Sequence, residues 1–142
     1  VINFVDIIKE QLIIASGEKM TITSSLDHID SHAIECRLNA TSVGKITSLH
    51  LPMGPWIRID THIYDGYKVS PYYDALLAKI IVHTPDRQTS IDVMVRALEE
   101  LYLEGVETNK EEQLTILQSK QFRSGVFTTQ LYEQLFKTEK KR

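Results

Sequence analysis

The chain has 142 residues, 42% of them hydrophobic and 25% charged, and its formal net charge is −3. This composition is typical of a globular domain with a buried core, and it excludes a largely disordered chain. The scattered basic residues argue against nucleic acid as a partner, and no apolar run approaches the roughly 20 residues that a membrane-spanning helix needs.

The N-terminal part of the chain predicts a helix over residues 5–15. Four apolar residues recur there at the spacing of one helical face: Val5, Ile8, Leu12 and Ala15. Gly17 follows as a helix-ending residue. We expect the apolar face to pack on the sheet that follows, or on a part of the protein outside this chain.

From residue 20 the apolar period changes to two, which indicates strands. A short strand is predicted over residues 20–23 and a clearer one over residues 32–39. In the second strand the side chains alternate, with Ile34, Cys36 and Leu38 on one side and Glu35, Arg37 and Asn39 on the other. The apolar side is therefore expected in the core.

Four further strands are predicted, over residues 45–50, 56–64, 67–69 and 75–82. The last is almost continuously apolar, interrupted by Lys79, and we interpret it as a central strand. Asp65 and Gly66 predict a two-residue hairpin between two of these strands, because glycine tolerates positive φ.

The rest of the chain predicts helices. After a capping segment at residues 84–86, five apolar residues form a helical stripe that Gly105 ends: Ile91, Met94, Val95, Leu98 and Leu101. A capping box, Thr108 with Glu111 or Asn109 with Glu112, predicts a helix through Leu117, and a last helix covers residues 128–136. The predicted class is α+β: an N-terminal helix, an antiparallel sheet and C-terminal helices packed on it, in one domain over residues 1–142.

Several chemistries are excluded by what the sequence contains. The six glycines are isolated, so no phosphate-binding glycine loop exists, and the five histidines lack the spacing of a zinc site. Cys36 is the single cysteine, which excludes an internal disulfide and favours a cytoplasmic protein. Because it lies on the apolar side of its strand, we interpret it as a buried hydrophobe rather than a nucleophile.

The polar side of the predicted strand over residues 32–39 has two possible interpretations. It is either a solvated sheet face, or a surface from which Arg37, oriented by Glu35, binds an anion. Tyr73 and Asp74, in the segment 70–74, either line a small-molecule pocket or belong to the rim of the core. Trp56, followed by Arg58, either contacts a partner or packs internally.

Several separated blocks of the sequence resemble biotin carboxylases, in the order that this family has them. They are residues 6–18, the strand 32–40 with its Glu-Cys-Arg core, residues 44–47, residues 71–79, and the stretch from Ala97 to Asn109. The resemblance covers essentially the whole chain, and it identifies the C-terminal domain of that family.

The resemblance implies specific roles. In the family, an ATP-grasp domain makes carboxyphosphate from ATP and bicarbonate, and CO₂ passes to the ureido nitrogen of biotin on a carrier protein. Arg37 stands at the arginine that binds bicarbonate and biotin, with Glu35 beside it. Asp74, next to Tyr73, resembles an acid near the biotin pocket. Trp56 and Arg58 resemble part of the homodimer contact.

The resemblance also implies partners and cofactors. We expect biotin on a biotin carboxyl carrier protein, a carboxyltransferase, and the protein's own ATP-grasp domains, which would bind ATP and Mg mainly outside this chain; no metal ligand is expected here. The expected parent is acetyl-CoA carboxylase of fatty-acid synthesis, with the chain inactive alone. Alternatives are a pyruvate, propionyl-CoA or urea carboxylase, or a non-catalytic interaction module.

Three departures from the family pattern stand out. The ATP-binding lysines, metal-binding glutamates and catalytic segment of the family precede the region that this chain resembles. The loop at residues 40–43 is shorter than the usual proline-containing loop, and Phe4 stands where a glycine is usual.

Overall fold

The structure, a computed structural model, describes residues 5–22 and 31–136. The predicted strand residue Thr23 and Phe4 lie outside the described residues. In chain order the elements are α1 (Ile7–Ala15), β1 (His32–Asn39), β2 (Gly44–Lys45), β3 (Ser48–His50), β4 (Ile57–Thr61), β5 (Lys68–Val69), β6 (Leu76–Thr84), α2 (Arg87–Glu100), β7 (Tyr102–Glu104), α3 (Lys110–Gln118), α4 (Lys120–Ser124) and α5 (Leu131–Phe136). The predicted α+β class is confirmed.

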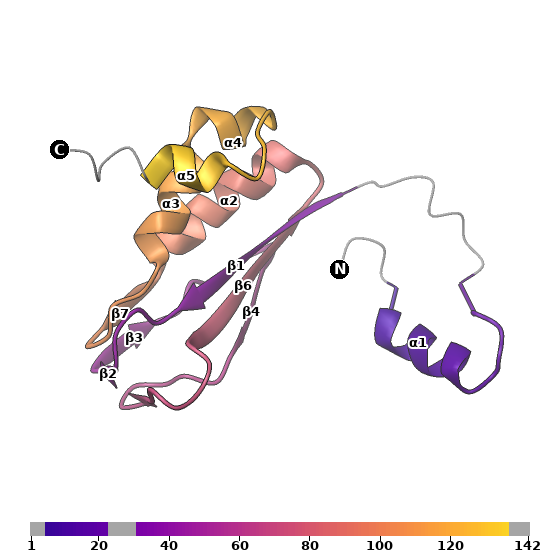
Figure 1. The fold of residues 1–142 in the computed structure, drawn as a ribbon, viewed down its shortest axis with the longest axis horizontal. Helices are drawn as coiled ribbons and strands as arrows, with labels where there is room; N and C mark the ends of the chain where they lie inside the picture. Colours follow the sequence, from indigo (N-terminus) through magenta and orange to yellow (C-terminus); the bar gives the residue numbers. More distant parts are fainter. Residues whose placement is uncertain (1–4, 23–30, 137–142) are drawn as a thin grey trace.

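The main sheet has three antiparallel strands in the order β1-β6-β4. Its middle strand is β6, as the apolar run at 75–82 predicts. Two small sheets pair β2 with β5 and β3 with β7, and both lie at the end of the main sheet away from α4 and α5 (Figure 1).

The core lies between one face of the main sheet and α2. Buried residues come from alternate positions of the strands and from one side of the helix: Cys36, Leu38, Ala78, Ile80, Val82, Ile91, Met94, Ala97 and Leu98. The helices α2 to α5 gather on this side of the sheet (Figure 1). Because side chains alternate along a strand, the opposite sheet face carries Glu35, Arg37 and Lys79. We call this second surface the outer face.

The start of α2 is tied to β1 by side-chain hydrogen bonds. Asp86 is the N-cap, and its carboxylate accepts from the backbone N–H of Thr89 at 2.9 Å and from the Thr89 hydroxyl at 2.6 Å. These bonds lower the pKa of Asp86. Ser90, fully buried, donates to the carbonyl of His32 at 3.0 Å and contacts the Thr84 hydroxyl at 2.7 Å. The polar groups of the first turn are therefore satisfied where they meet the sheet.

The helix α1 ends as the sequence predicts. Gly17 has φ 90°, its N–H donates to Ile14, and the N–H of Glu18 donates to Ile13, which is the Schellman arrangement. The predicted packing of its apolar face on the sheet is not observed. Ile8 and Leu12 are 66% and 68% exposed, and α1 stands apart from the sheet and the C-terminal helices (Figure 1).

Several other predicted elements differ from the structure. No strand forms at residues 20–22, and the run 45–50 splits into β2 and β3. The turn at Asp65–Gly66 exists, with Gly66 at φ 93°, but it joins no hairpin, because β4 pairs with β6 and β5 pairs with β2. Strand β7 and helix α4 were not predicted. Helix α3 forms with Asn109 at its N-cap, as one of the two predicted boxes has it, but the capping bond does not form, because the Asn109 side chain bonds Asn39 and Arg37 instead.

Candidate functional site

Arg37 lies on the outer face, and its backbone is held by α3. The carbonyl oxygen of Arg37 accepts from the side-chain amide of Asn109 at 3.2 Å and from that of Gln113 at 2.6 Å. The same Asn109 amide accepts from the backbone N–H of Asn39 at 2.9 Å. The side-chain amide of Asn109 thus forms the two backbone hydrogen bonds that a neighbouring strand would form. These bonds pair backbone groups on the edge of β1 that does not face β6.

The loop before α3 continues this pairing. Thr41 donates its N–H to the carbonyl of Glu107 at 2.8 Å, and Ala40 forms a bridge with Thr108. The loop must lie close to residues 44–45, since a Cβ at Gly105 would stand 2.0 Å from the carbonyl oxygen of Lys45. Gly105 also has φ 91°. Only glycine combines this φ with such a close approach.

The outer face carries two charged rows across the three strands. Arg37 is opposite Lys79, and Lys79 is opposite Asp60; in the next row Glu35 is opposite Ile81, and Ile81 is opposite Arg58. The Arg58 guanidinium binds both carboxylate oxygens of Asp60, with Nε–Oδ1 and Nη2–Oδ2 distances of 2.9 Å each. These bonds lower the pKa of Asp60 and raise that of Arg58.

The guanidinium of Arg37 has no hydrogen-bond or ion-pair partner among residues 5–22 and 31–136. Glu35 projects from the same face two residues away, but the two side chains form no ion pair in this part of the chain, so the orienting contact predicted for Glu35 is not seen. Both are exposed. The arrangement leaves a fork of five N–H donors available for an anion.

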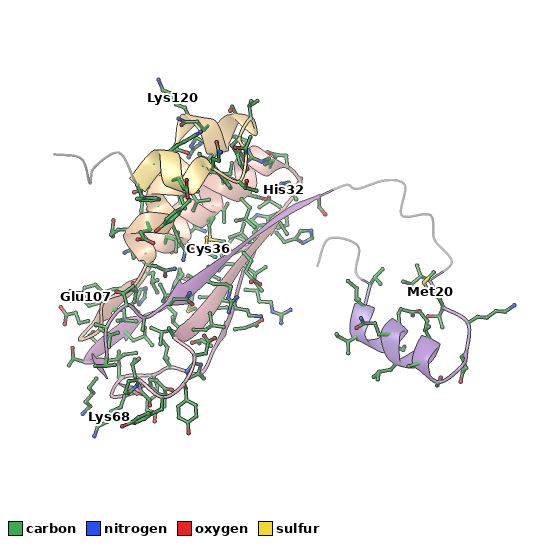
Figure 2. The ribbon with its side chains drawn as sticks, in the orientation of Figure 1. Met20, His32, Cys36, Lys68, Glu107 and Lys120 are labelled. Atoms are coloured by element: carbon green, nitrogen blue, oxygen red, sulfur yellow. The ribbon has the colours of Figure 1, made fainter. Side chains whose placement is uncertain are left out.

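Cys36, between these two residues, faces the core (Figure 2). It is 7% exposed, and burial raises the pKa of its thiol to about 12, with a further contribution from the charge of Glu35. A thiol with this pKa is not a nucleophile near neutral pH. The interpretation of Cys36 as a buried hydrophobe is confirmed.

Tyr73 and Asp74 meet in a pocket of about 400 Å³. Its lining comes from the β4–β5 connection, β5, the β5–β6 connection and the start of β6: His62, Tyr67, Val69, Ser70, Tyr73, Asp74, Leu76 and Leu77. The Asp74 carboxylate accepts from the N–H of Leu76 at 2.7 Å, and this bond fixes the carboxylate next to the first residue of β6. Tyr73 is 83% exposed and so is free to reorient.

The pocket lies at the start of β6, before the charged rows of the outer face. Leu77 lines it, but Leu77 is buried in the core and is the extra residue where the β1–β6 register shifts, so it does not share the outer face with Lys79. Arg37 itself does not line the pocket. The structure thus brings Tyr73 and Asp74 together in one pocket, whereas Arg37 lies on β1 opposite Lys79, five residues beyond Asp74 in the chain.

Trp56 is exposed in a strained turn. Its φ is 71°, and the N–H of Ile57 donates to the carbonyl of Gly54 at 3.4 Å, which is type II geometry with Pro55 leading. Glycine or asparagine is usual where Trp56 stands, and a bulky residue there is an outlier. The indole is 55% exposed, so internal packing is not its main role.

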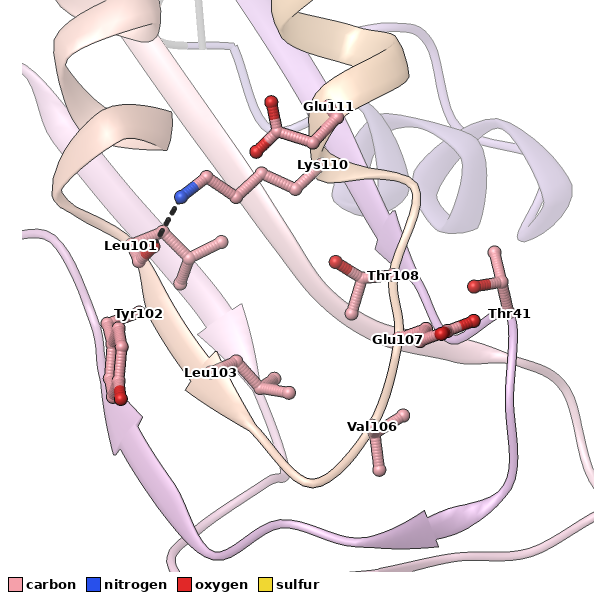
Figure 3. Close-up of a pocket in the computed structure, with 9 residues that line it drawn as sticks. All are labelled: Thr41, Leu101, Tyr102, Leu103, Val106, Glu107, Thr108, Lys110 and Glu111. Atoms are coloured by element: carbon pink, nitrogen blue, oxygen red, sulfur yellow. Dashed lines mark hydrogen bonds between the residues drawn. The ribbon is translucent and has the colours of Figure 1, made fainter.

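A second pocket, of about 420 Å³, was not indicated by the sequence. It lies between β7, the loop that follows it and the start of α3 (Figure 3), and its lining includes Tyr102, Glu107 and Glu111. Lys110 crosses it to donate to the carbonyl of Leu101 at 2.7 Å. Its walls depend on β7, which no periodicity predicted.

Comparison with known families decides what these elements belong to. The sequence model described as Biotin carboxylase C-terminal domain matches residues 35–134, from Glu35 in β1 to α5. The chain belongs to the biotin carboxylase C-terminal domain family. The resemblance seen in the sequence is therefore confirmed.

Relatives with different names share this family. The chain is 43% identical to a biotin carboxylase of Allochromatium vinosum, over 85% of this chain and 28% of that protein. It is 38% identical to a pyruvate carboxylase component from Methanothermobacter thermautotrophicus, over 94% of this chain and 29% of that protein. The chain thus spans under a third of the length of these relatives.

A solved relative has the same fold. It is the biotin carboxylase domain dimer of Hydrogenobacter thermophilus 2-oxoglutarate carboxylase, in complex with MgADP, ADP and bicarbonate. The match has a TM-score of 0.82 and 37% identity, and it covers 94% of this chain and 31% of that one. At this identity both the fold and the family are shared.

The side chains of this biotin carboxylase C-terminal domain do not form a metal site in the part that the structure describes. Within residues 5–22 and 31–136, no three His, Cys, Asp or Glu side chains are grouped so as to hold a metal ion. In the same part of the chain, no helix has the length and apolar character to cross a bilayer.

Proposed function

We propose that the intact protein carboxylates biotin with ATP and bicarbonate, and that this domain contributes Arg37 to the reaction. The observation that carries the proposal is a guanidinium without a partner in the described residues, on a strand whose backbone is held by Asn109 and Gln113. A donor kept in place by its backbone can stabilise a developing charge without reorganising.

Arg37 would act on two oxygen atoms. Its planar donors suit the carboxyl group of bicarbonate and the ureido oxygen of biotin, which becomes more negative as the ring nitrogen attacks. Asp74 and Tyr73 would border the ring in their pocket, and Glu35 would orient Arg37 once the site is complete. ATP and Mg²⁺ would supply the activation of bicarbonate from outside this domain.

The experiment replaces Arg37 in the intact protein and measures carboxylation of free biotin. R37Q should slow the reaction by roughly 10²–10³-fold, the usual cost of removing one such donor. R37K should recover little, because an ammonium lacks the bidentate fork. R96Q is the matched control, since Arg96 pairs with Glu100 on α2, away from the outer face. Full activity in R37Q would show that the proposal is wrong.

The parent enzyme is proposed to be an acetyl-CoA carboxylase of fatty-acid synthesis, working in the cytoplasm with a biotin carboxyl carrier protein and a carboxyltransferase. The identity to biotin carboxylases such as that of Allochromatium vinosum supports this. A pyruvate carboxylase is the second candidate, favoured by the Methanothermobacter relative. Offering acetyl-CoA, propionyl-CoA, pyruvate, 2-oxoglutarate and urea to the reconstituted enzyme separates these candidates, and only the true acceptor should become carboxylated.

Trp56 and Arg58 are proposed to contact a second copy in the intact protein. The exposed indole in its strained turn, and a relative described as a dimer, support this. Replacing both residues, as W56A with R58E, should shift the intact protein from dimer to monomer in sedimentation velocity. A dimer of unchanged stability would exclude them from the interface.

The 142-residue chain alone is expected to neither hydrolyse ATP nor carboxylate biotin. This follows from the proposal that ATP and Mg²⁺ bind in other domains of the intact protein. Bicarbonate-dependent ATP turnover by the isolated chain would contradict it, and would also contradict its assignment as one domain of a larger catalyst.

A further inference from the structure

Lys79 stands directly opposite Arg37 across the β1–β6 ladder. The carbonyl of Arg37 points away from β6, because it accepts from Asn109 and Gln113 on the free edge of β1. The pair is therefore of the non-hydrogen-bonded kind, in which opposite Cα atoms are roughly 4.5 Å apart and the side chains lie closest. The side chains of Arg37 and Lys79 therefore project side by side from the outer face.

The only carboxylate directly opposite Lys79 among the described residues is that of Asp60, which Lys79 shares with Arg58; the hydrogen bonds from Arg58 and the charges of both cations lower the pKa of Asp60. Asp60, on the other side of Lys79, gives both carboxylate oxygens to Arg58 at 2.9 Å. Glu35 is two residues from Arg37 on β1 and forms no ion pair with any residue that the structure describes. Among residues 5–22 and 31–136, Lys79 has no hydrogen-bond or ion-pair partner, although it is half-buried.

A like-charged pair in directly opposite positions disfavours the folded sheet. A binding site for an anion would account for it, because the anion removes the repulsion and gains two charged donors at once. The neighbouring Asp60 attracts Lys79 as well, but its single negative charge is shared with Arg58, which binds both of its oxygens, so the row keeps an excess of positive charge.

We propose that Lys79 is a second cationic contact for bicarbonate, which it binds together with Arg37 on the outer face. Arg37 offers a planar fork to the anion, and Lys79 offers a mobile point charge on a flexible stem. The inference rests on the proposed function of Arg37 and adds a binding residue that the site would otherwise lack.

The test measures steady-state kinetics of the intact protein with bicarbonate, ATP and free biotin varied in turn. K79Q should raise the KM for bicarbonate roughly tenfold to hundredfold, the effect of losing one charge-assisted contact. The KM for ATP should stay within about twofold. K79R should restore the KM for bicarbonate to within a few-fold, because it restores the charge. K68Q, which removes an exposed charge from β5, is the control and should leave all three constants unchanged.

The outcomes separate this inference from the function on which it rests. If R37Q abolishes carboxylation while K79Q leaves the KM for bicarbonate unchanged, the role of Lys79 is wrong and that of Arg37 stands. If R37Q is fully active, the proposed function itself fails. A fall in kcat alone, equal in K79Q and K79R, would indicate a structural role and overturn the inference. Should K79Q fold poorly, K79M keeps the aliphatic stem and takes its place in the same measurements.

Discussion

Adjacent residues of β1 differ completely in environment, since Cys36 faces the core and Arg37 faces outward. The alternation of side chains along a strand is enough to predict this difference from the sequence. The bonds that hold the Arg37 backbone were not predicted, because Asn109 is 72 residues away from it. A local pattern of residues carries no information on such a long-range contact.

Cys36 gives a direct prediction on reactivity. Its pKa is raised from 9.0 to about 12, so at pH 8 the thiolate should be about a thousandfold scarcer than in an ordinary cysteine. We expect iodoacetamide to leave the native chain unmodified over hours, and to label it within minutes in guanidinium chloride. Intact-protein mass spectrometry measures both, and rapid labelling of the folded chain would contradict the burial of Cys36.

At the scale of elements, the loop between β7 and α3 depends on Gly105. Alanine there would meet the carbonyl of Lys45 at 2.0 Å and would also have to adopt φ 91°. G105A should therefore lower the free energy of unfolding by roughly 2–4 kcal/mol. G125A is the control with positive φ alone, since nothing lies within 4 Å of its Cβ, and should lose only about 1 kcal/mol. Equal losses in urea denaturation would show that the close approach does not matter.

Strands β1 and β6 and helix α2 were predicted close to their observed bounds. Each buries several apolar side chains at a regular spacing, and this spacing is visible in the sequence. The strands β2, β5 and β7 have two or three residues each, and their partners are distant in the chain. The sequence shows the turn at Gly66 but not which strand β5 joins, because that choice depends on where β2 lies.

The cap of α2 predicts how stability depends on pH. The pKa of Asp86 is lowered from its ordinary 3.8 because the hydroxyl and N–H of Thr89 donate to its carboxylate. A lowered pKa in the folded state adds stability above the unfolded value, and this stability is lost as pH falls through the folded value. The D86N variant should therefore show a smaller fall in Tm than the wild type between pH 5 and about pH 3. Parallel Tm profiles of the two proteins would contradict this role.

At the scale of the whole molecule, α1 has an apolar face with nothing to cover it in the described residues. Ile7, Ile8, Leu12 and Ile14 are all more than half exposed. A contiguous exposed apolar surface commonly marks an interaction site. Since the relatives are more than three times as long as the matched region, the rest of the intact protein is the expected partner of this helix.

Leu12 tests this arrangement by comparing two lengths of the same protein. In the 142-residue chain L12A should change the free energy of unfolding by less than about 0.5 kcal/mol, because the side chain is 68% exposed. In the intact protein the same change should cost roughly 2 kcal/mol or more, since it would leave a cavity where α1 packs. K9A, an exposed change on the same helix, should be near neutral in both. Chemical denaturation of the four variants measures the difference, and equal effects of L12A in the two lengths would mean that α1 stays uncovered in the intact protein.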